Sequence, residues 1–329
     1  MPATQPTLEV EDLCTEFQTR AGLLTPVNGV SFSVEAGTIM GLVGESGCGK
    51  SLTAYSIMGL VDAPGRVSGG SIRLNGQQLR GLPAEALRRL RGNRIAMIFQ
   101  DPMMTLNPVL RIDTQMIEAI QAHARVSTKR ARLMAEDALA QVGIAAPAER
   151  LRCYPYQFSG GMRQRIAIAI ALLNKPDLIL CDEPTTALDV TIQAQILYEM
   201  QTLCRESGTA LVWITHDLSV VAGLADTVCV MYAGRVVESG PTGEVLRQPR
   251  HPYTQGLLAS APMRNPRGQP LHQIPGMMPS LLELPAGCAF RARCSHASAQ
   301  CDQLPPLRSS GQRAWRCFHP LAEVNEACA

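Results

Sequence analysis

The sequence predicts an α/β fold built around a largely parallel sheet, and three observations lead to this prediction. Short, continuous apolar runs recur between residues 39 and 214, as is typical of strands buried on both faces of a parallel sheet. A glycine-rich loop joins the first of these runs to a helical pattern. Strand signals then vanish between Pro108 and Tyr156, which predicts a helical insertion.

Composition narrows the class of protein. The 329 residues are 46% hydrophobic and 18% charged, with a net charge of +2, so a folded chain is expected and disorder is excluded as its main state. Because the charge is nearly balanced, we expect no nucleic-acid partner and no broad contact with an anionic bilayer. The chain shows neither an apolar run near the roughly 20 residues of a membrane-spanning helix nor a secretory signal, so an intracellular protein is expected.

The expected elements begin with a small sheet. Residues 8–17 and 30–34 alternate more strongly and are rich in β-branched side chains, which favours antiparallel strands beside the core. The core strands are expected at four apolar runs, namely residues 39–43, 95–99, 178–181 and 210–214. Residues 1–240 are expected to form one domain.

A helical insertion and a tail complete the expected fold. Residues 114–123 and 128–142 carry apolar side chains at spacings of three and four, which predicts helices inside an insertion at about 101–160. After residue 240, prolines recur at short intervals and break any long regular element. Residues 241–329 are therefore expected to form a Pro-rich domain around four clustered cysteines.

A phosphate-binding loop is the first functional feature. Residues 44–51 fit G-x-x-x-x-G-K-S between the strand at 39–43 and a helical run at 52–60. Glycines let successive backbone N–H groups face an anion, and the following helix adds the positive end of its dipole. Lys50 is expected to reach the β- and γ-phosphates, and Ser51 to bind Mg²⁺. The residues expected to bind nucleotide here are Gly44, Glu45, Ser46, Gly47, Cys48, Gly49, Lys50 and Ser51.

Cys48 supports a separate hypothesis because it lies inside this loop. A helix N-terminus and the neighbouring Lys50 predict a lowered pKa of the Cys48 thiol, so that alkylation would block nucleotide binding. The alternative is a small side chain tolerated at a variable loop position.

Two adjacent carboxylates follow the apolar run at 178–181. Placing two such charges at the end of a buried strand costs free energy unless they are paired or bind a ligand. Asp182 is placed to hold Mg²⁺, and Glu183 to orient or deprotonate an attacking water. The alternative, a solvated strand end, becomes weaker when the carboxylates are taken together with the phosphate loop.

A second anion-binding helix terminus is predicted far along the chain. Ser159, Gly160 and Gly161 precede a helix expected at 162–173, so a hydroxyl and glycine N–H groups would face an anion. These residues resemble the signature of the ATP-binding cassette (ABC) family. In that family a Ser-Gly-Gly motif closes over the γ-phosphate of ATP on the partner cassette of a head-to-tail dimer. The resemblance implies an ABC-type P-loop NTPase core with an antiparallel β subdomain.

Other landmarks of the ABC family follow in order. The resemblance implies that Gln100 senses the γ-phosphate and metal, that 187–189 with Asp189 crosses the dimer interface, and that His216 contacts the γ-phosphate. It also implies an aromatic ring stacked on adenine, for which Phe17 is the nearby candidate. The catalytic set would be Glu183, His216 and Gln100. With ATP and Mg²⁺ as cofactors, the implied metal ligands are Ser51, Gln100 and Asp182.

The tail contains Cys288, Cys294, Cys301 and Cys317. In a reducing compartment these cysteines suggest a thiolate metal site, and four buried free thiols are the alternative. Structural zinc usually shows a closer cysteine pair, so the wide spacing favours a larger cluster, with Zn²⁺ as the alternative metal.

Further motifs narrow the resemblance to the oligopeptide and dipeptide importer ATPases. These motifs are residues 158–164, 231–235 and 251–254, together with the cysteine-rich tail. Some members of that family carry a [4Fe-4S] cluster on such a tail, which implies that the four cysteines are its ligands. The resemblance also implies a peripheral protein on the cytoplasmic face of the bacterial inner membrane. Its partners would be two transmembrane permease subunits, a second ABC ATPase subunit and, indirectly, a periplasmic solute-binding protein.

Alternatives to peptide import stay open at this point. Nickel or glutathione are other cargoes, since peptides follow from the resemblance alone. A soluble ABC ATPase in DNA repair or translation, and a metal- or redox-sensing regulator, are other classes of protein. The single uninterrupted cassette and the near-neutral charge favour the transporter over the first class, and the intact Glu183 and His216 favour it over the second.

Overall fold

The computed structural model describes residues 5–185, 188–261, 265 and 272–322. The chain divides into two compact units. The first unit comprises Met1–Leu8, Val34–Thr38 and Gly81–Val212, and the second comprises Glu9–Ser33, Ile39–Arg80 and Trp213–Ala329. Strand β8 (Ala210–Thr215) runs from the first unit into the second.

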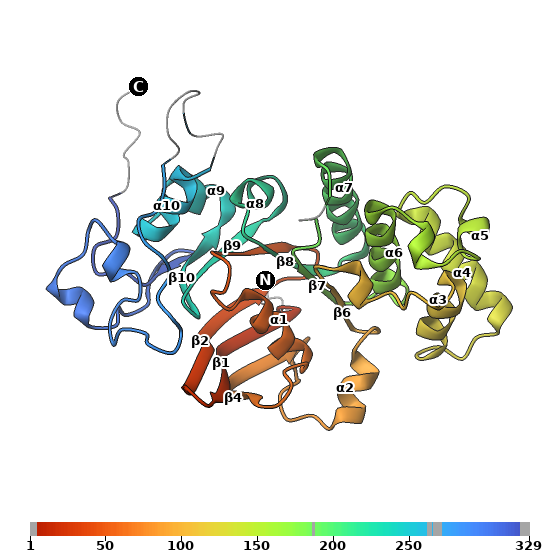
Figure 1. The fold of residues 1–329 in the computed structure, drawn as a ribbon, viewed down its shortest axis with the longest axis horizontal. Coiled ribbons are helices and arrows are strands. Elements are labelled where there is room, and N and C mark those ends of the chain that lie inside the picture. Colours follow the sequence, from red (N-terminus) through yellow and green to blue (C-terminus); the bar gives the residue numbers. More distant parts are fainter. Residues whose placement is uncertain (1–4, 186–187, 262–264, 266–271, 323–329) are drawn as a thin grey trace. The chain divides into compact units, whose positions relative to one another are not determined.

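The second unit contains the small sheet that the sequence predicts. Its strands are ordered β2-β1-β4-β5, and β2, β1 and β4 are labelled in Figure 1. Their bounds are β1 Leu8–Thr19, β2 Gly22–Val34, β4 Gly65–Leu74 and β5 Gln77–Gln78. The connection between β1 and β2 has two residues, which suffices only for an antiparallel hairpin. Both strands are longer than the alternating pattern indicates.

Core strands of the second unit lie in the order β11-β12-β10-β9-β3. Their bounds are β3 Ile39–Val43, β9 Thr227–Tyr232, β10 Arg235–Pro241, β11 Arg308–Ser310 and β12 Arg313–Trp315. All residues of β3 are buried, and it pairs in parallel with β9, with Leu42 opposite Cys229. Strand β10 is antiparallel to β9 and to β12, where Glu238 faces Trp315. The tail therefore extends this sheet, which the sequence did not predict.

Helices and aromatic side chains tie the tail to these strands. The helices of the second unit are α1 Lys50–Met58, α8 Leu218–Leu224, α9 Thr242–Arg247 and α10 Pro252–Ala259, and the tail adds 3₁₀ turns at Arg291–Arg293 and Ala299–Asp302. The ring of Tyr232 on β9 lies 4.6 Å from that of Tyr253 on α10 and 5.3 Å from that of Phe290, measured between centroids. All three side chains are buried, so the tail shares a hydrophobic core with β9.

The first unit contains the predicted helical insertion. Strands β6 (Ile95–Ile98) and β7 (Leu178–Asp182) pair in parallel, and α3 packs on α4 and α4 on α6 (Figure 1). The helices are α2 Ala84–Leu90, α3 Ile112–Gln121, α4 Thr128–Gln141, α5 Pro147–Arg150, α6 Gly160–Leu172 and α7 Val190–Ser207, with 3₁₀ turns at Pro102–Met104 and Pro155–Gln157. Buried Asp113 on α3 pairs with Arg111 and with Arg132 on α4. In the part of the chain that the structure describes, no helix has the length and apolar character needed to cross a membrane.

Candidate nucleotide-binding site

The phosphate loop, residues 44–51, connects β3 to α1, and packed backbone fixes its path. A Cβ atom on Gly44 would lie 2.2 Å from the carbonyl oxygen of Met231. A Cβ atom on Gly49 would lie 2.1 Å from the carbonyl oxygen of Pro26, and Gly49 also has a φ of 107°. Neither position can hold a larger residue without a backbone shift, which is the physical reason for both glycines of the motif.

Lys50 lies within the loop that it is predicted to serve. Its side chain is buried, and Nζ donates hydrogen bonds to the carbonyl oxygens of Gly44 at 2.8 Å and Glu45 at 3.0 Å. Helix α1 begins at the same residue. A buried cation beside the backbone N–H groups of a helix N-terminus is an arrangement suited to binding phosphate.

The Cys48 thiol differs from the expectation of a reactive group. The side chain is completely buried, and Sγ lies 2.8 Å from the place of a Cβ atom on Gly44. Burial raises the pKa of the Cys48 thiol, although the charge of Lys50 acts in the opposite direction. The prediction of a lowered thiol pKa is therefore wrong, because desolvation outweighs the nearby positive charge.

Glu45 has contacts that sequence reasoning missed. Its backbone N–H donates to the hydroxyl of Tyr253 at 2.9 Å, and its carboxylate pairs with Arg293 at 2.8 and 2.9 Å. Tyr253 belongs to the motif at 251–254, which the sequence offered only as a family likeness. That motif was the available signal for Tyr253, but it carried no indication of a contact with the phosphate loop.

The first unit carries the predicted carboxylates. Asp182 ends β7 with its side chain buried. Glu183 follows with a φ of 45°, a left-handed conformation that costs a non-glycine residue roughly 1–2 kcal/mol. Gln100, 83 residues earlier, donates from Nε2 to Glu183 Oε2 at 3.3 Å. The structure thus brings together two of the three predicted catalytic residues, and strain of this kind is concentrated at functional sites.

The Ser-Gly-Gly segment begins α6 two residues earlier than predicted. The Ser159 hydroxyl accepts a hydrogen bond from the N–H of Met162 at 3.3 Å, and Ser159 and Gly160 are exposed. A Cβ atom on Gly161 would lie 3.1 Å from Cγ2 of Ile192 on α7, so packing favours glycine there. A Cβ atom on Gly160 would meet no described atom within 4 Å.

The remaining predicted residues have visible structural roles or placements. Asp189 caps α7 by accepting a hydrogen bond from the N–H of Ile192 at 2.9 Å, whereas Ala187 of the same predicted loop lies outside the described residues. His216 is exposed directly after β8. The ring of Phe17 on β1 occupies the space where a Cβ atom on Gly65 would lie. The proposed contacts of these side chains with nucleotide stay predictions.

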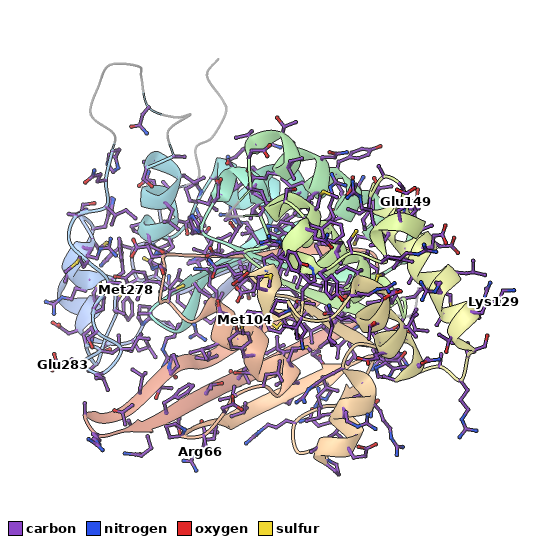
Figure 2. The ribbon with its side chains drawn as sticks, turned by 45° about the vertical axis from the view of Figure 1, so that its right-hand side comes forward. Arg66, Met104, Lys129, Glu149, Met278 and Glu283 are labelled. Atoms are coloured by element: carbon purple, nitrogen blue, oxygen red, sulfur yellow. The ribbon has the colours of Figure 1, made fainter. Side chains whose placement is uncertain are left out.

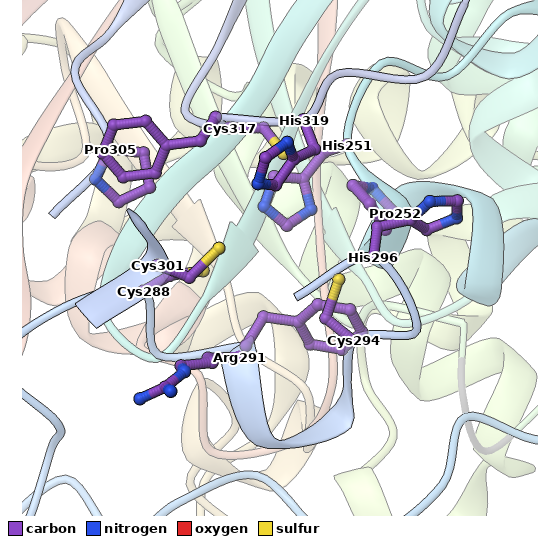
Figure 3. Close-up of a pocket in the computed structure, with 12 residues that line it drawn as sticks. His251, Pro252, Cys288, Arg291, Cys294, His296, Cys301, Pro305, Cys317 and His319 are labelled. Atoms are coloured by element: carbon purple, nitrogen blue, oxygen red, sulfur yellow. The ribbon is translucent and has the colours of Figure 1, made fainter. Parts of the chain in front are cut away.

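The four tail cysteines lie around one small cavity (Figure 3). Within the described residues, no three or more His, Cys, Asp or Glu side chains are arranged to hold a metal ion. The prediction of a [4Fe-4S] cluster on Cys288, Cys294, Cys301 and Cys317 is therefore wrong, and the zinc alternative finds no site in the part of the chain that the structure describes.

The volume of this cavity and the protonation of the thiols explain why the four cysteines do not form a metal site. The cavity measures about 10 Å³, room for roughly one water molecule. Burial raises the pKa of Cys288 and Cys294 and raises that of Cys317 to about 11, which favours neutral thiols over thiolate ligands.

Comparison with known families defines the class of protein. Residues 27–186 match the family described as "ABC transporter". The solved dimeric structure of MJ0796, a bacterial ABC transporter cassette, has a TM-score of 0.65 and 25% identity, covering 71% of this chain and 98% of that chain. The structure of cbiO1 from Clostridium perfringens has a TM-score of 0.62 and 24% identity, covering 74% and 91%, and so shares the fold. The chain is an ABC ATPase.

The relatives define the branch of that family. The oligopeptide transport ATP-binding protein OppD of Escherichia coli (strain K12) is 48% identical over 318 residues, covering 96% of this chain and 94% of that protein. OppD of Haemophilus influenzae is 46% identical over 302 residues, covering 92% and 93%. Residues 237–301 match the family "Oligopeptide/dipeptide transporter, C-terminal region". The chain belongs to the oligopeptide/dipeptide transporter ATP-binding proteins.

Proposed function

We propose that this chain is the ATP-hydrolysing subunit of a bacterial importer that couples ATP binding and hydrolysis to the uptake of oligopeptides or dipeptides. The observation that carries the proposal is similarity to OppD over 96% of the chain, including the separately matching C-terminal region. The match to a transporter C-terminal region favours this proposal over a soluble ABC ATPase of DNA repair or translation.

The residue roles proposed for ATP turnover follow the family motifs. Backbone N–H groups of the phosphate loop and Lys50 would bind the phosphates, and Ser51, Gln100 and Asp182 would hold Mg²⁺, which would neutralise the phosphate charge. Glu183 orients or deprotonates the attacking water, and its hydrogen bond with Gln100 supports this role. His216 contacts the γ-phosphate, and Phe17 is the candidate for adenine stacking.

A second cassette is proposed to complete each ATP site. Ser159 and Gly160 are exposed at the start of α6, as a surface that meets nucleotide on a partner would require. Their N–H groups and hydroxyl would bind the γ-phosphate of ATP held by that partner, and Asp189 would lie at the interface. We propose a second, different ABC ATPase subunit as the partner. The domain boundary at residue 240, with the helical subdomain at about 101–160, is also a proposal.

Contact with a membrane partner is proposed next to Gln100. Met104 and Val109 follow it in the chain and are 69% and 75% exposed (Figure 2 labels Met104). Exposed apolar side chains of this kind suit docking onto another protein. We propose two transmembrane permease subunits as the docking partners and a periplasmic solute-binding protein as the source of cargo. With these partners, the proposed location of the chain is the cytoplasmic face of the inner membrane.

Cargo is proposed only at the level of peptides. The E. coli "Probable D,D-dipeptide transport ATP-binding protein DdpD" is 47% identical over 324 residues, covering 98% of this chain and 99% of that protein. Relatives for different peptides are thus equally similar to this chain. Cargo selection is accordingly assigned to the binding protein and permeases, and nickel or glutathione remain alternatives.

The test is ATP hydrolysis by the complete importer in lipid vesicles, with and without peptide-loaded binding protein. The proposal predicts peptide-stimulated hydrolysis that Glu183→Gln lowers by about 100-fold or more, because general-base roles typically contribute 10²–10⁴-fold. ATP affinity should stay within about twofold. Normal hydrolysis in Glu183→Gln would contradict the role of Glu183, and hydrolysis that no peptide stimulates would contradict peptide import.

A further inference from the structure

Glu45, the second residue of the phosphate loop, is held from two sides by the C-terminal tail. Its backbone N–H donates to the Tyr253 hydroxyl, 208 residues away in sequence, at 2.9 Å. Its two carboxylate oxygens accept from the two terminal nitrogens of Arg293, 248 residues away, at 2.8 and 2.9 Å. The tail therefore contacts both the backbone and the side chain of one loop residue.

Arg293 is fixed from several directions. Its side chain is only 6% exposed, and Nη1 also donates to the Tyr232 hydroxyl at 3.2 Å. Nε donates to the carbonyl oxygen of Pro275 at 2.9 Å, and the guanidinium lies 5.8 Å from the ring centroids of Tyr232 and Phe290. A bidentate Arg–carboxylate pair is geometrically specific as well as strong. Here the additional contacts of the guanidinium fix its orientation.

The same loop residue also orients the lysine of the motif. The carbonyl oxygen of Glu45 accepts a hydrogen bond from Lys50 Nζ at 3.0 Å. Because Tyr253 takes the Glu45 N–H, that donor is engaged by the tail, and phosphate is left to the N–H groups further along the loop. A displacement of Glu45 would therefore move the lysine anchor and the start of the loop together.

We propose that Arg293 is a positioning residue for the phosphate loop, and that through it the C-terminal tail sets the ATP affinity of the cassette. The inference rests on the proposed role of residues 44–51 in binding ATP. It assigns no contact between Arg293 and nucleotide. By linkage, any event in the tail that moves Arg293 changes ATP affinity, and ATP binding opposes that event equally.

The test compares two arginines of the same 3₁₀ turn, Arg291–Arg293. Arg291 is the matched control, because its side chain is 46% exposed and pairs with Asp302. ATP affinity of the full-length chain is measured by equilibrium titration, and KM and kcat are measured in the complete importer. Arg293→Gln should raise Kd and KM for ATP by about tenfold with kcat within about twofold, because it weakens ground-state and transition-state binding alike. Arg291→Gln should leave both within about twofold.

A double-mutant cycle tests whether the effect passes through Glu45. Glu45→Gln should raise Kd similarly, and the double variant should be no worse than the weaker-binding single variant, because both changes remove one interaction. Arg293→Lys keeps the positive charge but lacks the planar guanidinium that makes two hydrogen bonds at once. It serves as a milder substitution if Arg293→Gln does not fold. Additive losses, or wild-type Kd in Arg293→Lys and Arg293→Gln, would overturn the inference. If Lys50→Ala binds ATP as the wild type does, the assignment of the loop itself fails.

Discussion

The phosphate loop and the cysteine-rich tail pack against neighbouring residues of the same strand, β9, but they use their space differently. In the loop, a Cβ atom on Gly44 would collide with the Met231 carbonyl oxygen, and one on Gly49 with the Pro26 carbonyl oxygen. Glycines of this kind let a loop turn its backbone N–H groups toward an anion. The tail places Tyr253 and Phe290 on Tyr232, and its cysteines surround only about 10 Å³. We interpret the loop as shaped for a ligand, whereas the tail is filled by its own side chains. A ligand site needs a particular backbone path and volume besides the right residue types.

The largest effect is expected from filling the loop itself. Gly49→Ala would place a Cβ atom 2.1 Å from the Pro26 carbonyl oxygen at a φ of 107°. We expect ATP affinity to fall by about 100-fold or more, and the free energy of unfolding to fall by about 3 kcal/mol. Equilibrium ATP titration and urea denaturation measure the two effects.

Gly160→Ala is the matched control for this change, because a Cβ atom at residue 160 meets no described atom within 4 Å. It should leave the free energy of unfolding within about 0.5 kcal/mol of the wild type, whereas hydrolysis in the complete importer should fall if Gly160 meets nucleotide. Equal destabilisation by both substitutions would contradict the difference drawn between packed and open glycines.

A smaller effect is expected from acidifying the tail. His251 is buried, and its Nδ1 accepts a hydrogen bond from the N–H of Tyr253 at the start of α10. Burial lowers the pKa of His251 from 6.5 to about 4. Between these values the unfolded chain binds a proton that the folded chain does not, so stability falls as pH decreases through this range. At pH 5 this contribution is about 2 kcal/mol relative to pH 7.

Urea denaturation at pH 7 and pH 5 tests the role of His251. His251→Asn keeps a helix-capping side chain but cannot be protonated, so its stability should depend less on pH by that amount. The same loss of stability in the variant and the wild type would show that other groups cause the acid sensitivity.

The smallest effect is expected from the cysteines. Cys317→Ser replaces a buried neutral thiol with a hydroxyl in a cavity that has room for roughly one water. We expect the free energy of unfolding to change by about 1 kcal/mol and ATP affinity to stay within about twofold. A large loss of structure in Cys317→Ser would contradict the description of this thiol as one that only packs against neighbouring side chains.

Local sequence signals predicted much of the fold, and the candidate nucleotide site rests on signals of the same kind. The apolar run of β3, the glycines of the phosphate loop and the carboxylates after β7 each carry their signal within a few residues. Strands β11 and β12 have three residues each, which is too short for a periodic pattern, so the extension of the sheet by the tail was missed.

Long-range contacts and volumes could not be predicted in this way. Tyr253 and Arg293 lie 208 and 248 residues after Glu45 in the sequence. They meet Glu45 only because α10 and the tail pack against β9. The cysteine spacing showed residue types suited to metal, but it did not specify the cavity volume or the burial that favours neutral thiols.

The difference between the phosphate loop and the cysteine-rich tail is tested most directly by measuring the metal content and the ATP binding of the same purified protein. Iron, zinc and acid-labile sulfide per chain are measured on protein purified without oxygen, beside ATP binding by the same sample and by Cys294→Ser. We predict one ATP site per chain, no stoichiometric iron, sulfide or zinc, and unchanged ATP binding in the variant. About four irons and four sulfides per chain, lost in Cys294→Ser, would contradict the description of the tail as a region filled by its own side chains.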